Sequence, residues 1–220
     1  MAGKDTTIAD RTAEVRQQSA QRLPADATAA FDAELARLVG LGVPAGVAAP
    51  GTPMPDGDLL DVDGKPTTLT AARAGRPAVV VFYRGAWCPY CNVMLRAYQE
   101  KLVGELDSRG VALVAISPQQ PDGSLSVAEK HDLSYAVVSD PGNQIARGLG
   151  IVFSLGEGAR AGQAKLGLDL TTVNADGTHD LPLATTVVVD AEGTIRWIDV
   201  RPDYTTRSEP AEIIAAVDSL

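Results

Sequence analysis

The sequence predicts an α/β fold with a central mixed β-sheet flanked by helices and an N-terminal helical extension. Two apolar, β-branched runs, at residues 79–83 and 111–117, are typical of strands buried on both faces, and a stretch with helical spacing lies between them. This order indicates a βαβ unit with parallel strands. A further pair of strands over 185–200 is joined by a tight Ala-Glu-Gly turn, which predicts an antiparallel hairpin.

The first 41 residues predict the helical extension. Residues 5–41 are charged, rich in Ala and nearly free of Gly, so we expect one or two amphipathic helices with a break at Pro24. The extension at 1–41 either covers apolar surface of the domain or forms the contact of a homodimer. Residues 42–57 contain four prolines and four glycines, which predict a linker or an ordered coil that leads into the domain at 58–220.

Local hydrophobic patterns and turn residues give the order of the remaining elements. The apolar positions that follow Cys91 recur in steps of three and four, as in a helix with one buried face. The expected elements are a hairpin over 58–69 that turns at Asp63-Gly64, the strand at 79–83, a helix from Cys91, the strand at 111–117, a crossover helix over 127–132, a short strand at 137–141, a short helix at 145–149, an irregular segment over 154–180, the hairpin over 185–200 and a helix over 213–220. An irregular segment of that length near the active edge is expected to shape a substrate site.

The cysteines of the chain, Cys88 and Cys91, lie at the junction between the strand at 79–83 and the following helix. The first turn of a helix carries unpaired N–H groups and a partial positive charge, which stabilise a thiolate. The pKa of a thiol can then fall from about 8.5 into a range of roughly 3.5 to 7.5. Pro89 suits the first helical position, because a missing N–H costs little there. Residues three apart are neighbours on a helix, so the two sulfurs can form a disulfide.

The cysteine pair has two other interpretations besides redox chemistry. The cysteines could be small buried hydrophobic residues, or they could supply half of a zinc site. The sequence has no second cysteine pair to complete four zinc ligands, and only His131 and His179 could add to them. The spacing therefore favours a redox-active pair, with no metal and no cofactor expected.

The charge of the chain argues against several classes of partner. The formal net charge is −9 and the pI is about 4.7, so neither nucleic acid nor an anionic membrane is an expected partner. The N-terminus lacks the apolar core of a signal peptide, and no run of about 18 apolar residues occurs. We therefore expect a cytoplasmic protein. Because thiols are kept reduced in that compartment, a single cysteine pair is more often catalytic than structural there.

Four motifs occur in a characteristic order along the chain. They are Phe-Tyr-Arg-Gly-Ala-Trp-Cys-Pro-Tyr-Cys at 82–91, Val-Ser-Asp-Pro-Gly at 138–142, Val-Asp-Ala-Glu-Gly-Thr-Ile-Arg at 189–196 and Asp-Tyr-Thr-Thr-Arg at 203–207. From about Gly51 to the C-terminus, the chain resembles the AhpC/TSA, or peroxiredoxin-like, branch of the thioredoxin superfamily. The resemblance implies a thioredoxin-like fold with a reactive cysteine at a helix N-terminus. It also implies reduction of hydrogen peroxide or an organic hydroperoxide at the expense of thioredoxin or a similar dithiol.

The resemblance implies two different assignments of the cysteines. In thioredoxin-like proteins the first cysteine of the pair attacks, which corresponds to Cys88 with Cys91 as the resolving residue. In typical peroxiredoxins the reactive cysteine follows a Thr or Ser by three residues, which corresponds to Cys91. We expect the peroxidase cycle, in which Cys91 forms a sulfenic acid and Cys88 condenses with it to give a disulfide. The alternatives are a protein disulfide reductase led by Cys88 and a redox sensor without turnover.

Residues around the pair are further candidates for the site. Ala184 stands where the resemblance leads us to expect either the Arg of peroxiredoxins or the cis-Pro of thioredoxins. Arg84 could supply the cationic donor that stabilises a thiolate and polarises a peroxide, or it could form only a surface ion pair. Trp87, Pro89 and Tyr90 are candidate substrate contacts, and the aromatic rings would serve equally well in packing.

Overall fold

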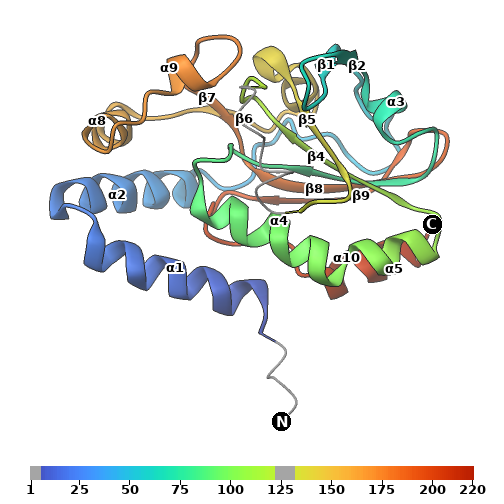
Figure 1. Ribbon diagram of the computed structural model, residues 1–220, viewed down its shortest axis with the longest axis horizontal. Coiled ribbons are helices and arrows are strands. Elements are labelled where there is room, and N and C mark those ends of the chain that lie inside the picture. The colour runs from blue at the N-terminus through green and yellow to red at the C-terminus, as the bar shows by residue number, and fades with distance from the viewer. Residues whose placement is uncertain (1–5, 122–131) are drawn as a thin grey trace.

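A seven-stranded mixed β-sheet forms the centre of the molecule, and helices cover both of its faces (Figure 1). The computed structural model describes residues 6–121 and 132–220. The strands are β1 (Leu59–Leu60), β2 (Pro66–Thr67), β3 (Ala78–Phe82), β4 (Ala112–Ser117), β5 (Ala136–Ser139), β6 (Val152–Ser154), β7 (Asp180–Pro182), β8 (Ala184–Val189) and β9 (Ile195–Arg201). β6 and β7 form a separate small sheet. The predicted α/β fold with a central mixed sheet is confirmed.

The main sheet combines a parallel centre with antiparallel edges. Its strand order is β2-β1-β5-β4-β3-β8-β9. β4 pairs in parallel with both β3 and β5, as predicted for the βαβ unit. β8 pairs antiparallel with β3 and with β9, which confirms the hairpin over 185–200. β1 and β2 form the predicted hairpin on either side of Asp63-Gly64.

The helices follow the predicted order closely. They are α1 (Ile8–Arg22), α2 (Ala25–Leu41), α3 (Leu69–Ala72), α4 (Pro89–Lys101), α5 (Val103–Ser108), the 3-10 turn η1 (Pro141–Asn143), α7 (Gln144–Gly148), α8 (Glu157–Lys165), α9 (Leu170–Val173) and α10 (Pro210–Val217). The predicted break at Pro24 is confirmed. The expected crossover helix at 127–132 falls outside the described residues except for Asp132. Over the two described ranges, no helix is both long and apolar enough to cross a membrane.

The central strands send alternate side chains into two hydrophobic cores. Val79 and Val81 of β3 pack with α4, α5 and α10 on one face. Val80 and Phe82 pack with α2, α3 and α7 on the other face. Because neighbouring residues of a strand point to opposite faces, a strand covered on both sides must be apolar at every position, as β3 is. The continuous apolar run in the sequence follows from this double burial.

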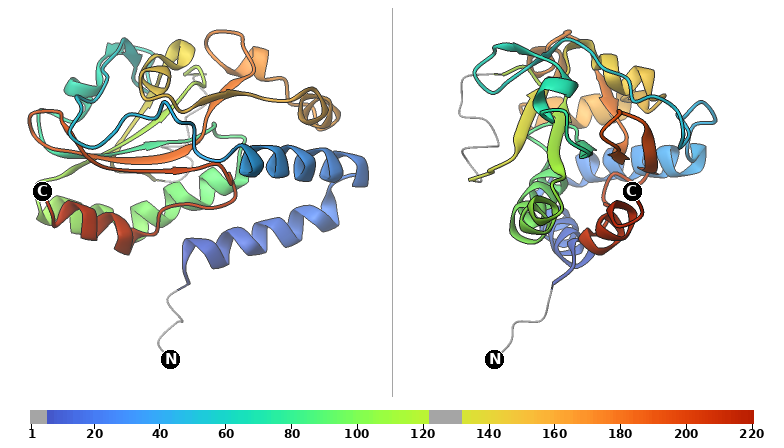
Figure 2. Two further views of the ribbon diagram at one scale, coloured as in Figure 1. Left: turned by 180° about the vertical axis from the view of Figure 1, so that it is seen from behind. Right: turned by 90° about the vertical axis from the view of Figure 1, so that its right-hand side faces the viewer.

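The helical extension packs on the domain. α1 lies alongside α4 and α10 (Figure 2), and Ile8 is buried in the core that these helices share. The backbone N–H groups of Ile8 and Ala9 donate to the carboxylate of Glu209, the residue that precedes α10, at 3.1 and 2.9 Å. A carboxylate at the start of a helix satisfies free N–H groups and interacts favourably with the helix dipole. The extension therefore covers domain surface, as one of the two interpretations expected.

The prediction that 154–180 is irregular is wrong. This part of the chain contains α8 and α9 and contributes residues to β6 and β7. A small core of its own buries Leu155, Ala159, Leu170 and Leu181. The longest of these elements, α8, has nine residues and carries two glycines, so no apolar period develops in the sequence. The element forms because it packs against α2, a contact that the local sequence does not reveal.

Residues 42–57 form a coil that is bound to the domain. The backbone N–H of Ala48 donates to Leu149 O at 3.0 Å, and the N–H of Gly51 donates to Ile195 O at 2.7 Å. Gly150 has a φ of +74°, and a Cβ atom there would lie 2.4 Å from Gly46 O in the coil. The division into an extension at 1–41, a linker at 42–57 and a domain at 58–220 stays a prediction.

Substitution of Gly150 tests how firmly the coil is held. We expect Gly150→Ala to lower the free energy of unfolding by about 1 to 3 kcal/mol more than Gly110→Ala, because its Cβ would collide with the coil. Gly110 is the matched control, since its φ is +69° but nothing lies within 4 Å of the added Cβ. We expect Gly110→Ala itself to lower the free energy of unfolding by about 1 kcal/mol, because alanine disfavours the left-handed backbone conformation. Urea unfolding measures the free energy of unfolding of both variants. An equal decrease in the two variants would show that the coil is not fixed in place.

Candidate active site

The two cysteines lie at the start of α4, just beyond the end of β3. Cys88 is the N-cap residue of α4, Pro89 occupies the first position of the helix, and Cys91 lies in the first turn. The relative exposure of each cysteine is 0%. Both are free thiols. The predicted junction of strand and helix therefore brings both sulfurs to the positive end of a helix, inside the core.

Each sulfur accepts a hydrogen bond from its own arginine. Nη2 of Arg84 lies 3.2 Å from Cys88 Sγ, and Nη2 of Arg207 lies 3.2 Å from Cys91 Sγ. Arg84 comes from the segment between β3 and α4, whereas Arg207 comes from the loop before α10. The two guanidinium groups are buried, with 7% and 5% exposure. The site thus pairs two buried thiols with two buried cations.

Neither guanidinium forms an ion pair with a carboxylate within residues 6–121 and 132–220. Arg207 donates to the carbonyl oxygens of Tyr204 and Thr206. Cζ of Arg84 lies over the rings of Trp87 and Tyr204, 5.1 and 4.0 Å from their centroids. The faces of aromatic rings attract a cation, but they carry no net charge. Since a buried charge is costly without a partner, a thiolate is the anion that best balances this site.

The pKa values of the two cysteines are shifted in opposite directions. Burial opposes ionisation of Cys88, but the hydrogen bond from Cys91 and the charges of Arg84 and Arg207 lower its pKa well below the usual value. Burial and the neighbouring Cys88 raise the pKa of Cys91 well above the usual value. The two thiols are close neighbours, so the lowered and the raised pKa belong to the pair as a whole.

The neighbouring sulfurs also shift the pKa of Arg84. Burial opposes the charge on Arg84, but Cys88 and Cys91 raise its pKa above the ordinary value. Arg84 therefore stays charged while Cys88 is ionised. The alternative that Arg84 forms only a surface ion pair is wrong, because the side chain is buried and contacts a sulfur.

The four residues expected around the cysteines lie together. Arg84, Trp87, Pro89 and Tyr90 all line one cavity of about 440 Å³, which begins next to the cysteine pair. The cysteines do not line this cavity, and Arg84 lies between it and Cys88.

Sequence reasoning missed two residues of this arrangement, Arg207 and Tyr204. Both belong to the Asp-Tyr-Thr-Thr-Arg motif at 203–207, which was the available signal. Ala184, where the family pattern led us to expect Arg or cis-Pro, is the first residue of β8 and is buried. The guanidinium that contacts Cys91 comes instead from Arg207, 116 residues away in sequence.

A zinc site is not formed by the part of the chain that the structure describes. No group of three or more His, Cys, Asp or Glu side chains is placed there to hold a metal ion. His179 lies between α9 and β7, and His131 is outside the described residues.

The comparisons with known proteins agree on one family. The model of the AhpC/TSA family matches residues 50–198. Chloroplastic peroxiredoxin Q of Gentiana triflora is 30% identical over 148 residues, which cover 67% of this chain and 57% of that protein. Peroxiredoxin Bcp of Escherichia coli is 28% identical over 144 residues, which cover 66% of this chain and 80% of that protein. The match to chloroplastic peroxiredoxin Q of wheat covers 59% of that protein. The chain therefore spans less than three fifths of the length of each of the two plant relatives.

Solved structures show the same fold at low identity. Peroxidoxin BcpB of Mycobacterium tuberculosis superposes with a TM-score of 0.58 and 19% identity, over 78% of this chain and 97% of that one. A peroxiredoxin-like protein from Aquifex aeolicus gives a TM-score of 0.60 and 17% identity, over 79% of this chain and 88% of that one. The matches support the thioredoxin-like fold of the domain.

The ionisation of Cys88 can be followed by thiolate absorbance at 240 nm. Because the folded pKa of Cys88 is lowered, we expect the reduced protein to keep one thiolate at neutral pH and to lose it only on further acidification. Ionised Cys88 should therefore contribute stability that is fully present above the unfolded pKa of about 8.5 and declines as the pH falls through the folded pKa. Cys88→Ser should abolish this titration. A wild-type absorbance that appears only above about pH 8.5 would contradict the proposed proton distribution.

Proposed function

This chain belongs to the AhpC/TSA family, and from that premise we propose that it is a thiol-dependent peroxidase that reduces hydroperoxides. The observation that carries the proposal is the buried pair of sulfurs, each hydrogen-bonded to its own guanidinium. A buried thiolate next to a cation is a strong nucleophile, and the guanidinium can also stabilise the oxygen that leaves the peroxide. No metal or organic cofactor is needed for this chemistry.

The proposed cycle has three steps that balance in atoms and electrons. The thiolate of Cys88 attacks the distal oxygen of ROOH, so the O–O bond breaks and Cys88 becomes a sulfenic acid, while the alkoxide takes a proton from the solvent and leaves as ROH. The thiol of Cys91 then attacks the sulfenic sulfur and forms the Cys88–Cys91 disulfide with release of water. A dithiol donor finally reduces the disulfide by exchange and becomes a disulfide itself.

The choice of Cys88 as the attacking residue differs from the sequence-based expectation that Cys91 leads. The lowered pKa of Cys88 and the raised pKa of Cys91 support this exchange of roles. Cys91 is well suited to resolve the sulfenic acid, because it is the immediate neighbour of Cys88 and its proton can pass to the departing hydroxide. In this assignment Arg207 holds Cys91 in place, and Arg84 activates Cys88.

Partners and location follow as further parts of the proposal. The substrate is a hydroperoxide, and the reductant is thioredoxin or a similar dithiol. We propose a cytoplasmic protein without nucleic-acid or membrane partners, in line with the net charge of −9. A homodimer is also proposed, and the exposed apolar side chains of Val39, Leu41 and Val43 at the end of α2 support a contact there.

A second candidate function is the reduction of protein disulfides. The lowered pKa of Cys88, the first residue of the Cys-Pro-Tyr-Cys sequence, favours it, because the first cysteine attacks in thioredoxin-like exchange. Turnover of insulin disulfides at a rate that matches peroxide turnover would favour this candidate over a peroxidase.

Rapid mixing of the reduced protein with hydrogen peroxide tests the cycle. We expect Cys88→Ser to lose the fast oxidation, because it removes the proposed nucleophile. Cys91→Ser should keep one fast oxidation and accumulate a sulfenic acid on Cys88, identified by the mass of a trapped adduct. Fast oxidation lost only in Cys91→Ser would return the leading role to Cys91. Oxidation of all three proteins at the rate of a free thiol would exclude the peroxidase.

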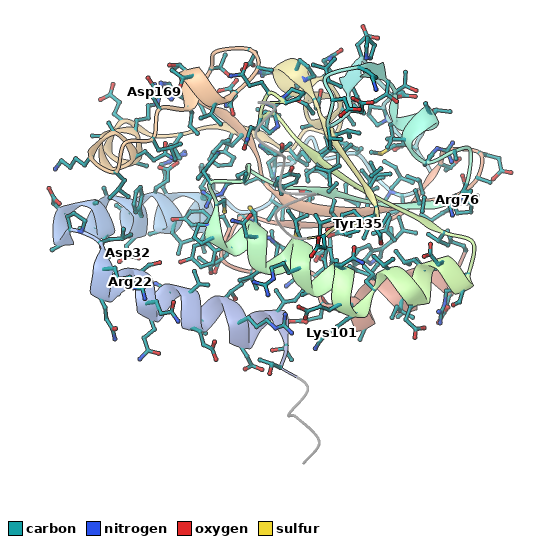
Figure 3. The ribbon with its side chains drawn as sticks, viewed as in Figure 1. Arg22, Asp32, Arg76, Lys101, Tyr135 and Asp169 are labelled. Atoms are coloured by element: carbon teal, nitrogen blue, oxygen red, sulfur yellow. The ribbon has the colours of Figure 1, made fainter. Side chains whose placement is uncertain are left out.

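Replacement of Arg84 tests electrostatic activation. We expect Arg84→Met to slow oxidation by peroxide about 100-fold, because the thiolate loses its hydrogen-bond donor and the leaving oxygen loses its stabilising charge. The substitution removes a buried charge without a carboxylate partner, so folding should be maintained. Arg76→Met is the matched control. Arg76 is exposed and lies at the opposite end of the molecule from Asp32 of α2 (Figure 3). Similar rates for the two variants would exclude a role for Arg84 in the reaction.

A further inference from the structure

The position of Arg84 depends on packing more than on hydrogen bonds. Among the described residues, its side chain donates one hydrogen bond, from Nη2 to Cys88 Sγ, and its Nε has no partner. The side chain is nevertheless buried, with 7% exposure. A guanidinium group carries five N–H donors in a rigid plane, so several hydrogen bonds usually fix its orientation. Other contacts must therefore keep this guanidinium against the sulfur.

Tyr204 contacts both guanidinium groups of the site. The centroid of its ring lies 4.0 Å from Cζ of Arg84, the arginine beside Cys88. The backbone carbonyl oxygen of Tyr204 accepts a hydrogen bond from Nη1 of Arg207 at 2.6 Å. Nη2 of Arg207 in turn donates to Cys91 Sγ. One residue therefore contacts the cation next to each of the two sulfurs.

The Tyr204 ring is one of two aromatic rings that Arg84 contacts. The other ring belongs to Trp87, which follows Arg84 by three residues in the same segment between β3 and α4. Tyr204 lies between β9 and α10, and its exposure is 8%. The attraction between a cation and the face of a ring is stronger where water is excluded. Of the two rings, that of Tyr204 is the one that fixes Arg84 to a distant part of the chain.

The Tyr204 ring is itself fixed at both of its ends. Its hydroxyl donates to the carbonyl oxygen of Phe31 in α2 at 3.1 Å. Burial raises the pKa of Tyr204 to about 12, so the hydroxyl keeps the proton that it donates at neutral pH. The backbone on either side belongs to a turn in which the Asp203 carboxylate accepts from the N–H of Thr205 at 2.8 Å. The ring thus connects α2 to the chain before α10.

We propose that Tyr204 is a positioning residue for the peroxidase reaction: its ring holds the guanidinium of Arg84 against Cys88, and its hydroxyl fixes the ring to α2. The helical extension contributes in this way to the activation of the nucleophile. Neither α2 nor Tyr204 lies within residues 50–198, which the family model matches. The inference rests on the proposed peroxidase function and adds a residue that acts through Arg84.

A double-mutant comparison tests whether Tyr204 acts through Arg84. We expect Tyr204→Leu to slow oxidation by hydrogen peroxide about tenfold in the otherwise wild-type protein, because the guanidinium loses the buried face of the ring. In the Arg84→Met background, the same substitution should change the rate less than about twofold, since residues that act through one another have non-additive effects. Equal losses in the two backgrounds would overturn the proposal.

Tyr204→Phe tests the contact with α2. This variant keeps the ring and loses the hydrogen bond to Phe31, so we expect oxidation to be slowed about threefold. A rate equal to that of the wild type would overturn the role of the contact with α2. If Tyr204→Leu fails to fold, the comparison of the two backgrounds is made with Tyr204→Phe, and equal losses again overturn the proposal.

Tyr135→Leu is the matched control for the loss of a buried tyrosine. The hydroxyl of Tyr135 also donates to a helix carbonyl, Leu95 O of α4, at 2.9 Å. Within residues 6–121 and 132–220, its ring faces no guanidinium. We expect the rate of oxidation to stay at the wild-type value in this variant. A loss as large as that in Tyr204→Leu would show that the effect comes from packing alone and would overturn the proposal.

Titration of the thiolate absorbance at 240 nm separates this inference from the proposed function, because it involves no turnover. We expect Tyr204→Leu to raise the midpoint for Cys88 by about one pH unit, since the displaced cation no longer stabilises the thiolate. Tyr135→Leu should leave the midpoint unchanged. If peroxide reacts with the wild type no faster than with a free thiol but the midpoints follow this pattern, the peroxidase proposal fails and the positioning of Arg84 by Tyr204 stands. If peroxide reacts rapidly but Tyr204→Leu changes neither the rate nor the midpoint, the positioning role fails.

Discussion

The charge balance between two buried arginines and two buried cysteines governs the centre of this molecule. Arg84 and Arg207 have no carboxylate partner in the described structure, and each donates to a sulfur. Burial of an unpaired cation costs several kcal/mol in real proteins, so the site is most stable when a thiolate offsets part of that charge. The thiolate form of the pair, which is the reactive form in the proposed cycle, is in this way electrostatically favoured. A site with neutral thiols would hold two uncompensated charges in the core.

The surrounding fold keeps the four side chains together. β3 and α4 fix Cys88, Cys91 and Arg84 within a single local turn of chain. Arg207 comes from the far end of the sequence, and its loop is tied to α4 because the buried hydroxyl of Tyr98 donates to Ser208 O at 2.8 Å. The hydroxyl of Ser208 also lies 3.0 Å from the Thr186 hydroxyl on β8. The second guanidinium therefore depends on packing between α4, β8 and the chain before α10.

Features that depend on local sequence could be predicted, and features that depend on distant contacts could not. The apolar runs identified β3 and β4, the Asp-Gly and Ala-Glu-Gly turns identified two hairpins, and the cysteine pair was correctly expected at the start of a helix. The contact of Arg207 with Cys91 joins residues 116 positions apart, and no spacing rule reveals it. α8 escaped prediction because its stability comes from α2.

The two guanidinium groups also bear on the redox equilibrium of the pair. Oxidation to a disulfide consumes the thiolate and leaves both cations without an anion, whereas reduction restores the negative charge between them. Stabilisation of the thiolate in the dithiol form raises the reduction potential of a disulfide and makes it more oxidising. In the proposed cycle, the charges that activate the nucleophile therefore also favour the transfer of electrons from the dithiol donor to the oxidised protein. The positive charges around the pair therefore favour reduction of the disulfide.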